Sequence, residues 1–198
     1  MNVIDSLKNK TTDEIKNYCY RNMINASVGM MQISGDFNLS TLVRNANFFG
    51  FEYVHYIGNK KWDRRGSVGT HHYTDMVYHK CEKSFIENIR EQNFTLIGVE
   101  NNIPDYSYKT FDIFDLDVVF DNPLFLFGEE RLGLNKSILD ICDHIITIPN
   151  HGSVRSLNVG TASGIIMGLY RNLYEKRIKL TDRLVDVSYI GTQGSMYF

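Results

Sequence analysis

Residues 148–162 read Ile148-Pro149-Asn150-His151-Gly152-Ser153-Val154-Arg155-Ser156-Leu157-Asn158-Val159-Gly160-Thr161-Ala162. The β-branched run from Ile145 to Ile148 predicts a short strand that stops at the proline. A polar loop follows, and Ser156-Leu157-Asn158 then begins a long segment whose apolar residues recur at helical spacing. Backbone N–H groups at a helix start lack partners within the helix, so they suit a polar ligand. We therefore expect a ligand site where this strand, loop and helix meet.

An upstream segment, Asn38 to Gly50, is predicted to be a helix. Asn38 is a residue type that caps helix N-termini, and Gly50 is a type that ends helices. Arg44 is the one charged side chain in this span. The apolar residues recur at helical spacing: Leu39, Leu42, Val43, Ala46 and Phe49.

A third segment, Leu124 to Leu134, is predicted to be a buried strand that runs into a charged turn with two glycines. Leu124–Phe127 is continuously apolar, as expected for a strand covered on both faces. Ligands of open α/β sheets bind beyond the carboxyl ends of strands. Glu129 is therefore a candidate site carboxylate, and Gly128 would let the backbone approach a ligand closely.

Predicted strands and helices alternate along the chain. Strands are expected at residues 27–33, 53–57, 94–99, 124–127 and 145–148, and helices at 11–23, 38–50, 85–92, 137–142 and 158–177. Thr11 and Glu14 have the spacing of a capping box at the start of the first helix. The alternation predicts an α/β fold, with a mostly parallel sheet flanked by helices.

The composition is that of a folded domain, with 198 residues, 43% hydrophobic and 22% charged. No apolar run reaches membrane-spanning length, and the N-terminus has no basic region followed by an apolar one. We therefore expect a cytoplasmic protein with no membrane partner. Cys19, Cys81 and Cys142 are odd in number and far apart, which predicts reduced structural thiols rather than disulfides or a cysteine zinc site.

Taken together and in this order, the three segments resemble the SPOUT superfamily of RNA methyltransferases, and within it the SpoU/TrmH-type ribose 2′-O-methyltransferases. The family pattern is an N-x-x-x-x-x-R helix, a strand followed by G-x-E-x-x-G-L, and a strand followed by I-P and S-L-N-V. This chain carries the pattern as Asn38…Arg44, Gly128-Glu129-Glu130-Arg131-Leu132-Gly133-Leu134, and Ile148-Pro149…Ser156-Leu157-Asn158-Val159. The resemblance covers residues 27–175.

The resemblance implies a fold and an assembly. SPOUT proteins tie their C-terminal segment through a deep trefoil knot and form homodimers, so both are expected here, although general topology rules disfavour a knot. Residues 1–26 would be an N-terminal helical extension and residues 27–178 the SPOUT-like catalytic domain. Residues 179–198 would be a C-terminal tail, either a mobile arm or a docked strand.

The resemblance also implies an activity, the transfer of a methyl group from S-adenosyl-L-methionine to a ribose 2′-OH in structured RNA. A tRNA is favoured over rRNA, because the chain lacks a large N-terminal RNA-binding domain. Two alternatives stay open. One is a SPOUT enzyme that methylates a base nitrogen, and the other is a catalytically silent RNA-binding protein of the same fold.

By resemblance, the catalytic set is Arg44, Glu129, Ser156 and Asn158. The family assigns activation of the 2′-OH to the arginine. Because a guanidinium stays protonated, we expect Arg44 to orient the target phosphate and to stabilise negative charge on the attacking oxygen. Glu129 would receive a proton or hold a ribose or base donor. Ser156 and Asn158 would bind the substrate ribose and the arginine, cap the last helix, or do both.

Cofactor positions also follow from the resemblance. The cofactor is expected against backbone groups near Val99, Gly128, Ile148, Ser156 and Leu157. The substrate side is expected to include Asn38, Lys60, Lys61, Arg64, Arg65 and Arg131. The stretch Ser67-Val68-Gly69-Thr70 resembles the family's S-x-G-A, and its threonine in place of alanine leaves the shape of this loop open.

Charge is unevenly distributed along the chain. The formal net charge is −2, whereas RNA-binding proteins usually present a basic face. Lys60, Lys61, Arg64 and Arg65 nevertheless cluster around Trp62, so this loop is predicted to contact phosphates. The alternative is a solvated loop without a ligand.

No metal is expected. His71 and His72 are adjacent and His79 lies seven residues beyond, which is not the H-x-x-x-H spacing of a helical metal site. We expect loop or RNA-facing histidines instead. The acidic run from Asp112 to Asp121 lacks the order of an EF-hand, and the glycine motifs of P-loops and dinucleotide-binding folds are absent.

Glycines recur at every fourth position of the last predicted helix, at Gly160, Gly164 and Gly168. Each costs about 1 kcal/mol relative to alanine in a helix. The stripe therefore predicts very close backbone packing, either against the domain's own sheet or at a subunit interface.

Overall fold

The sheet has seven strands in the described part of the chain, and all of them run parallel. The computed structural model describes residues 3–32, 37–101, 103–129 and 132–193. The strands are β1 (Ser27–Gln32), β2 (Tyr53–Gly58), β3 (Asp75–His79), β4 (Thr95–Val99), β5 (Thr110–Asp112), β6 (Pro123–Phe127) and β7 (His144–Thr147). Their order across the sheet is β3-β2-β1-β6-β4-β7-β5. The predicted α/β fold with a mostly parallel sheet is confirmed.

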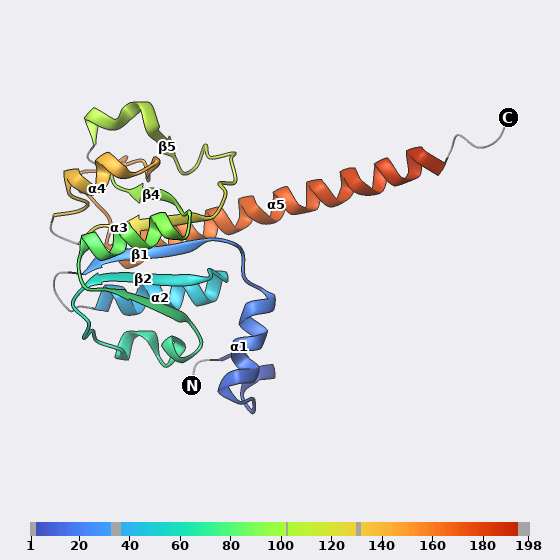
Figure 1. Ribbon diagram of the computed structural model, residues 1–198, viewed down its shortest axis with the longest axis horizontal. Helices are drawn as coiled ribbons and strands as arrows, with labels where there is room; N and C mark the ends of the chain where they lie inside the picture. The colour runs from blue at the N-terminus through green and yellow to red at the C-terminus, as the bar shows by residue number, and fades with distance from the viewer. Residues whose placement is uncertain (1–2, 33–36, 102, 130–131, 194–198) are drawn as a thin grey trace.

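Helices cover both faces of this sheet (Figure 1). The α-helices are α1 (Thr12–Arg21), α2 (Phe37–Phe49), α3 (Glu82–Glu91), α4 (Lys136–Ile141) and α5 (Val159–Gln193), and the 3₁₀ turns are η1 (Asp5–Leu7), η2 (Arg65–Ser67), η3 (Thr70–His72) and η4 (Pro104–Lys109). Residues of α2 and α5 share one core with the sheet, and residues of α3 and α4 share the other. The molecule is thus built in three layers.

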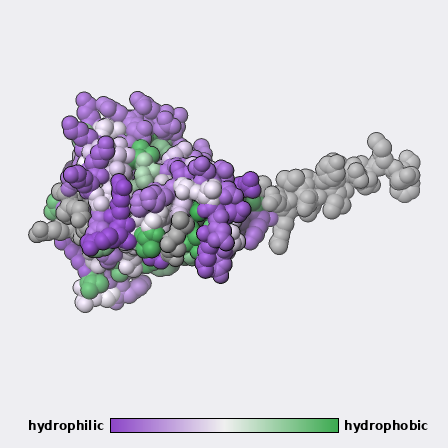
Figure 2. All heavy atoms as spheres, turned by 90° about the horizontal axis from the view of Figure 1, so that it is seen from below, coloured by the Kyte–Doolittle hydropathy of each residue, from purple (hydrophilic) through white to green (hydrophobic). Residues whose placement is uncertain are grey.

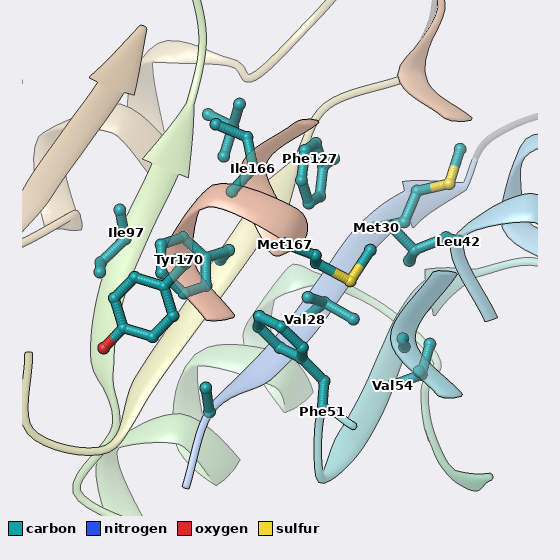
Figure 3. Packing of buried hydrophobic residues seen from close by; sticks show 14 of the residues in the cluster. Val28, Met30, Leu42, Phe51, Val54, Ile97, Phe127, Ile166, Met167 and Tyr170 are labelled. Carbon is teal, nitrogen blue, oxygen red and sulfur yellow. The ribbon is translucent and has the colours of Figure 1, made fainter. Parts of the chain in front are cut away.

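Alternate residues of a strand point to opposite faces of the sheet. In β6, Phe125 and Phe127 belong to the core beneath α2 and α5, whereas Leu124 and Leu126 belong to the core beneath α3 and α4. Figure 3 shows the first of these cores, in which side chains of α5 such as Tyr170 lie over the strands. Because β6 is buried on both faces, it has no polar residue.

The strand order places the carboxyl ends of β4, β6 and β7 side by side. Val99, the last residue of β4, is in register with Phe127 at the end of β6 and with Ile146 near the end of β7. The loops that follow these three strands therefore leave the sheet at one place. That place is where ligands bind in open α/β sheets.

Most predicted elements are found within a few residues of their expected bounds. The capping box of α1 is present, with the Glu14 N–H donating to Thr11 Oγ1 at 3.2 Å and the Thr11 N–H donating to Glu14 Oε2 at 2.9 Å. β3 and β5 were not predicted. Both are short edge strands that carry polar residues, so their sequences lack the apolar signal of a central strand.

The predicted helix cap at Asn38 is wrong. Helix α2 begins at Phe37, so Asn38 lies inside its first turn, where the side chain is buried. Its Oδ1 accepts a hydrogen bond from Asn158, a residue distant in sequence. The predicted end is confirmed, because Gly50 follows the helix with a φ of +70°.

Helix α5 is much longer than predicted. It runs to Gln193 instead of ending at residue 177, and its C-terminal half projects away from the layers (Figure 1). A docked strand is therefore wrong for residues 179–193, which are helical, whereas an arm beyond residue 178 stays a prediction. After Gly168 no glycine or proline interrupts the sequence before Gly191, so no strong helix breaker ends the helix earlier.

The glycine stripe of α5 packs against α2 of the same chain. A Cβ on Gly160 would lie 2.8 Å from Thr41 Cγ2, one on Gly164 would lie 3.4 Å from Asn45 Nδ2, and one on Gly168 would lie 3.2 Å from Phe49 Cζ. The contacting residues of α2 are themselves four apart. The close packing is as predicted, but the partner is a helix rather than the sheet or a second copy.

The face shown in Figure 2 is mostly polar over the described residues, with small hydrophobic patches between the polar ones. Within the described ranges, no helix has the length and apolar character needed to cross a membrane.

Candidate functional site

A pocket of about 210 Å³ opens where the loops after β4, β6 and β7 meet. It is lined by Val99, Glu100, Asn101, Phe127, Gly128, Glu129, Leu132, Gly133, Leu134, Ile148, Arg155, Ser156, Leu157, Val159 and Ala162. Every position predicted to hold the cofactor is in this set, namely Val99, Gly128, Ile148, Ser156 and Leu157. The structure therefore brings together three segments that are far apart in the sequence, while the role of each residue stays a prediction.

The turn after β6 is compact because two glycines make it so. A Cβ on Gly128 would lie 2.2 Å from the carbonyl carbon of Gly133, and Gly133 has a φ of +68°. The Gly133 N–H donates to the Glu129 carbonyl at 2.9 Å. This turn keeps Glu129 at the rim of the pocket, while Arg131, predicted to bind substrate, lies outside the described residues.

The start of α5 is joined to the start of α2 by two asparagines. Asn158 Oδ1 accepts a hydrogen bond from the Thr161 N–H at 3.2 Å, which caps α5. Asn158 Nδ2 donates to Asn38 Oδ1 at 3.0 Å. The predicted capping role of Asn158 is confirmed, and the same side chain orients Asn38. Ser156 lines the pocket two residues before this junction.

Arg44 does not line this pocket. It is exposed on α2 and borders a separate groove of about 770 Å³, which also includes Tyr18, Thr70 and Arg171. Successive residues of a helix are about 100° apart, so the side chains of Asn38 and Arg44, six residues apart, point in directions that differ by about 120°. Within one chain, the structure does not bring Arg44 to Glu129 and Ser156.

The basic loop lies between β2 and η2, beside the start of α2. Ser40 Oγ donates a hydrogen bond to the Asp63 carbonyl, and the Arg65 guanidinium lies 5.3 Å from the ring of Phe37. Hydrogen bonds from Arg65 lower the pKa of Asp63 below its usual value. The Arg65 side chain is thus held by the Asp63 carboxylate and the ring of Phe37.

The other cations of the loop also rest on aromatic rings or face solvent. The Arg64 guanidinium lies 5.8 Å from the ring of Trp62, and Lys60 Nζ lies 5.6 Å from the ring of Tyr78. Lys61 is exposed. Three of the four predicted basic residues therefore lie over aromatic rings, in the loop that Ser40 of α2 binds at Asp63.

The small-residue loop after η2 has an unusual backbone. Val68 and Gly69 both have positive φ, +49° and +85°, and a β-branched residue in this region is strained. The buried Ser67 lies 2.7 Å from His71 through Oγ and Nδ1. Thr70, where the family usually has alanine, is buried and lines the same groove as Arg44.

His79 is not a loop or RNA-facing residue, and that prediction is wrong. It is buried in β3, where its Nε2 lies 3.0 Å from Nδ1 of His55. Burial, and then the neighbouring His79, lower the pKa of His55 to about 3. The described residues contain no group of three or more His, Cys, Asp or Glu arranged to hold a metal ion.

The pocket also contains three residues that were not predicted from the sequence. Glu100 and Asn101 directly follow β4, and Arg155 precedes Ser156. Glu100 and Asn101 could have been predicted from the sequence, because polar residues directly after a buried strand are candidates for ligand binding.

Comparison with known proteins identifies the family. Residues 25–168 match the SpoU rRNA Methylase family, which is more than two thirds of the chain. The tRNA (guanosine(18)-2′-O)-methyltransferase of Escherichia coli K12 is 24% identical over 144 residues, covering 71% of this chain and 60% of the relative. The enzyme of the same name from Thermus thermophilus is 26% identical over 133 residues, covering 66% of each. The chain therefore spans about 60% of the length of the E. coli relative.

Solved structures share the fold. The A. aeolicus TrmH/SpoU tRNA modifying enzyme superposes with a TM-score of 0.69 at 19% identity, over 84% of this chain and 83% of that one. The SpoU methyltransferase AviRb from Streptomyces viridochromogenes, in complex with AdoMet, gives a TM-score of 0.65 at 23% identity, over 80% and 62%. Because the family model matches more than two thirds of its residues, this chain belongs to the SpoU rRNA Methylase family.

Proposed function

We propose that the protein transfers a methyl group from S-adenosyl-L-methionine to a ribose 2′-OH of structured RNA, with tRNA as the substrate. The observation that carries this proposal is the pocket at the ends of β4, β6 and β7, where residues of two motif segments, after β6 and after β7, meet the residues that follow β4. Relatives in E. coli and T. thermophilus carry the name tRNA (guanosine(18)-2′-O)-methyltransferase, which supports tRNA over rRNA.

The pocket suits the proposed cofactor chemically. Apolar side chains of Val99, Leu134 and Leu157 offer walls for an adenine ring, and the turns supply backbone donors and acceptors. The carboxylate of Glu129 suits a cationic sulfonium. S-adenosyl-L-methionine, when bound, supplies a methyl group that is open to in-line attack.

The residues of the chain would hold the acceptor and manage its proton. Glu129, at the rim, is available to accept the hydroxyl proton or to hold a ribose hydroxyl. Ser156 presents a hydroxyl at the same opening. Asn158 uses Oδ1 to cap α5 and one N–H to hold Asn38, so its main contribution would be to orient these segments. Placing the acceptor close to the methyl group contributes several kcal/mol, on the order of those measured for intramolecular reactions.

A homodimer would complete this site. Arg44 faces a groove away from the pocket of its own chain. Large apolar side chains around that groove are exposed, with Phe48 at 81%, Ile4 at 54% and Tyr18 at 44%, and exposed apolar clusters of this kind favour association. We propose that Arg44 of one copy reaches the pocket of the other, where it orients the target phosphate and stabilises the developing oxyanion.

The surface of Lys60, Lys61, Arg64 and Arg65 is proposed to contact RNA phosphates outside the pocket. Residues 27–178 are proposed as the catalytic unit, with the deep trefoil knot of the SPOUT fold. Residues 1–26 and the projecting part of α5 would be accessory segments.

The test incubates the purified full chain with methyl-labelled S-adenosyl-L-methionine and, separately, with tRNA and rRNA, followed by digestion to nucleosides. We expect label in a 2′-O-methyl nucleoside from tRNA. Label in a modified base would assign base methylation instead, and label only in rRNA would contradict the tRNA substrate. Binding of RNA without any transfer would favour the silent RNA-binding alternative.

A further inference from the structure

The two residues that follow β4 contact both neighbouring loops of the pocket. β4 lies between β6 and β7 in the sheet, so a side chain just beyond its end reaches the loops after both. Glu100 Oε2 accepts a hydrogen bond at 3.1 Å from the Leu134 N–H, in the loop after β6. Asn101 pairs with Ile148, in the loop after β7. The two side chains thus join the three segments that form the pocket.

Glu100 uses both carboxylate oxygens as acceptors. Oε1 accepts from the Asn101 N–H at 2.9 Å, and Oε2 accepts from the Leu134 N–H. A carboxylate accepts at both oxygens, whereas a glutamine carboxamide has one acceptor and one donor. Glutamine would therefore point an NH₂ group at one of these two backbone donors.

Asn101 has the complementary requirement. Its Nδ2 donates to the Ile148 carbonyl at 2.9 Å, and its Oδ1 accepts from the Ile148 N–H at 3.0 Å. An aspartate would lose the donor and place a charged oxygen against that carbonyl. These hydrogen bonds therefore require a carboxylate at position 100 and a carboxamide at position 101.

The turn held by Glu100 is the one that carries Glu129. A Cβ on Gly133 would lie 2.2 Å from Glu100 Oε2, so the carboxylate lies directly against the turn. Gly133 in turn donates its N–H to the carbonyl of Glu129. A shift of Glu100 would therefore move Gly133, and through Gly133 it would move Glu129 at the pocket rim.

We propose that Glu100 and Asn101 are positioning residues that preorganise the cofactor pocket by clamping the loops after β6 and β7 to the end of β4. This inference rests on the proposed function of the pocket as the S-adenosyl-L-methionine site. Neither side chain is assigned a contact with the reacting atoms. Their effect is to hold the loops in the binding geometry before the cofactor arrives.

The first measurement is S-adenosyl-L-methionine binding by calorimetry, with the full chain and variants of nearly unchanged shape. Glu100→Gln and Asn101→Asp should each raise the Kd about tenfold, because each turns a hydrogen bond of the pocket into a repulsive contact. Glu91→Gln, at the exposed end of α3, is the matched control and should leave the Kd unchanged. Glu100→Gln removes a negative charge and Asn101→Asp adds one. If charge attraction to the cationic cofactor governed binding, Asn101→Asp would bind more tightly than wild type, and that result would overturn the clamp.

The second measurement needs no cofactor. Amide hydrogen exchange of the cofactor-free protein should speed up at Leu134 or Asn101 in Glu100→Gln. It should speed up at Ile148 in Asn101→Ala, which removes the acceptor of the Ile148 N–H, while amides in the core of β6 keep wild-type rates. Unchanged exchange at all three amides would refute the clamp whether or not the cofactor binds. Faster exchange together with no binding by wild type would support the clamp and contradict the proposed function, so the two failures are distinguishable.

Discussion

At the residue scale, Gly133 occupies a position where φ is +68° and the nearest carboxylate oxygen leaves no space for a Cβ. Gly152 lies in the neighbouring loop, where a Cβ would lie 4.0 Å from its nearest neighbour, Asn150 Oδ1. The two glycines therefore differ in what they contribute. Gly133 is required by geometry, whereas Gly152 leaves open space for a methyl group.

Gly133→Ala should lower the free energy of unfolding by about 1–3 kcal/mol, because it adds backbone strain and a clash with Glu100. It should also weaken S-adenosyl-L-methionine binding. Gly152→Ala is the control and should change stability by less than about 0.5 kcal/mol. Urea denaturation of both variants measures the difference, and equal stabilities would contradict the role given to the turn.

Arg44→Ala tests the catalytic assignment at the same scale. We expect turnover to fall by at least about 100-fold, the usual effect of removing a group that stabilises an oxyanion. The Kd for S-adenosyl-L-methionine should stay within a few-fold of wild type, because Arg44 does not line the pocket. Arg90→Ala, exposed at the end of α3, should leave turnover unchanged. Normal turnover in Arg44→Ala would remove this residue from the mechanism.

At the element scale, the packing of α2 on α5 sets the position of both motif helices. Gly160 lies against Thr41, and Asn45 Nδ2 donates to the Gly160 carbonyl at 3.0 Å. Because the two helices approach closely here, Asn38 and Asn158 come within hydrogen-bonding distance. The glycines thus act on the site through helix spacing.

Two similar substitutions in the glycine stripe of α5 should change the stability of the protein in opposite directions. Gly164→Ala should stabilise the protein by up to about 1 kcal/mol, since alanine favours the helix and its methyl group would make an ordinary contact. Gly160→Ala should destabilise it by about 1–2 kcal/mol, because the methyl group would overlap Thr41. Adding Thr41→Ser to Gly160→Ala should recover part of the loss. Stability curves that rank the two single variants the other way would contradict this packing.

The pairing of β2 and β3 buries His55 beside His79 and predicts a pH dependence. Burial, then His79, lower the pKa of His55 from 6.5 to about 3, so at pH 5 the unfolded chain binds a proton there and the folded chain does not. The stabilisation is fully present above the unfolded pKa and is lost as the pH falls toward the folded one. The free energy of unfolding should then fall by up to about 1.4 kcal/mol per pH unit below 6.5.

Denaturation between about pH 7 and pH 4 measures this slope. His55→Gln should have a shallower slope than wild type, and the exposed control His151→Gln should keep the wild-type slope. If His55→Gln and wild type have parallel curves, the buried pair does not govern the pH dependence.

At the scale of the whole molecule, the groove of Arg44 and the cofactor pocket lie apart within one chain. A dimer in which each copy completes the other's site makes a distinctive prediction. Arg44→Ala and Glu129→Gln should each be inactive, yet a mixture that exchanges subunits should recover up to about a quarter of the wild-type activity, because half of the dimers then contain one intact site. No recovery after verified exchange would mean that Arg44 acts within its own chain.

Local signals determined a large part of this structure before any contact was known. The periodicity of apolar residues and the helix-capping residues predicted α1, most of the strands and the start of α5. These features depend on residues within one or two turns of each other. The three motifs marked the ends of β6 and β7 and the helix α2, and all five predicted cofactor positions line one pocket.

Tertiary structure alone decided which of these pieces meet. The position of β4 between β6 and β7 is what turns Glu100 and Asn101 into pocket residues, and no local pattern encodes strand order. Asn38 lies inside α2 and accepts a hydrogen bond from Asn158, 120 residues away, a contact that its local sequence does not encode. Arg44 matched its motif in sequence, but its direction from α2 depends on how that helix packs. Long-range packing sets neighbours and directions, whereas the sequence near a residue sets only its local conformation.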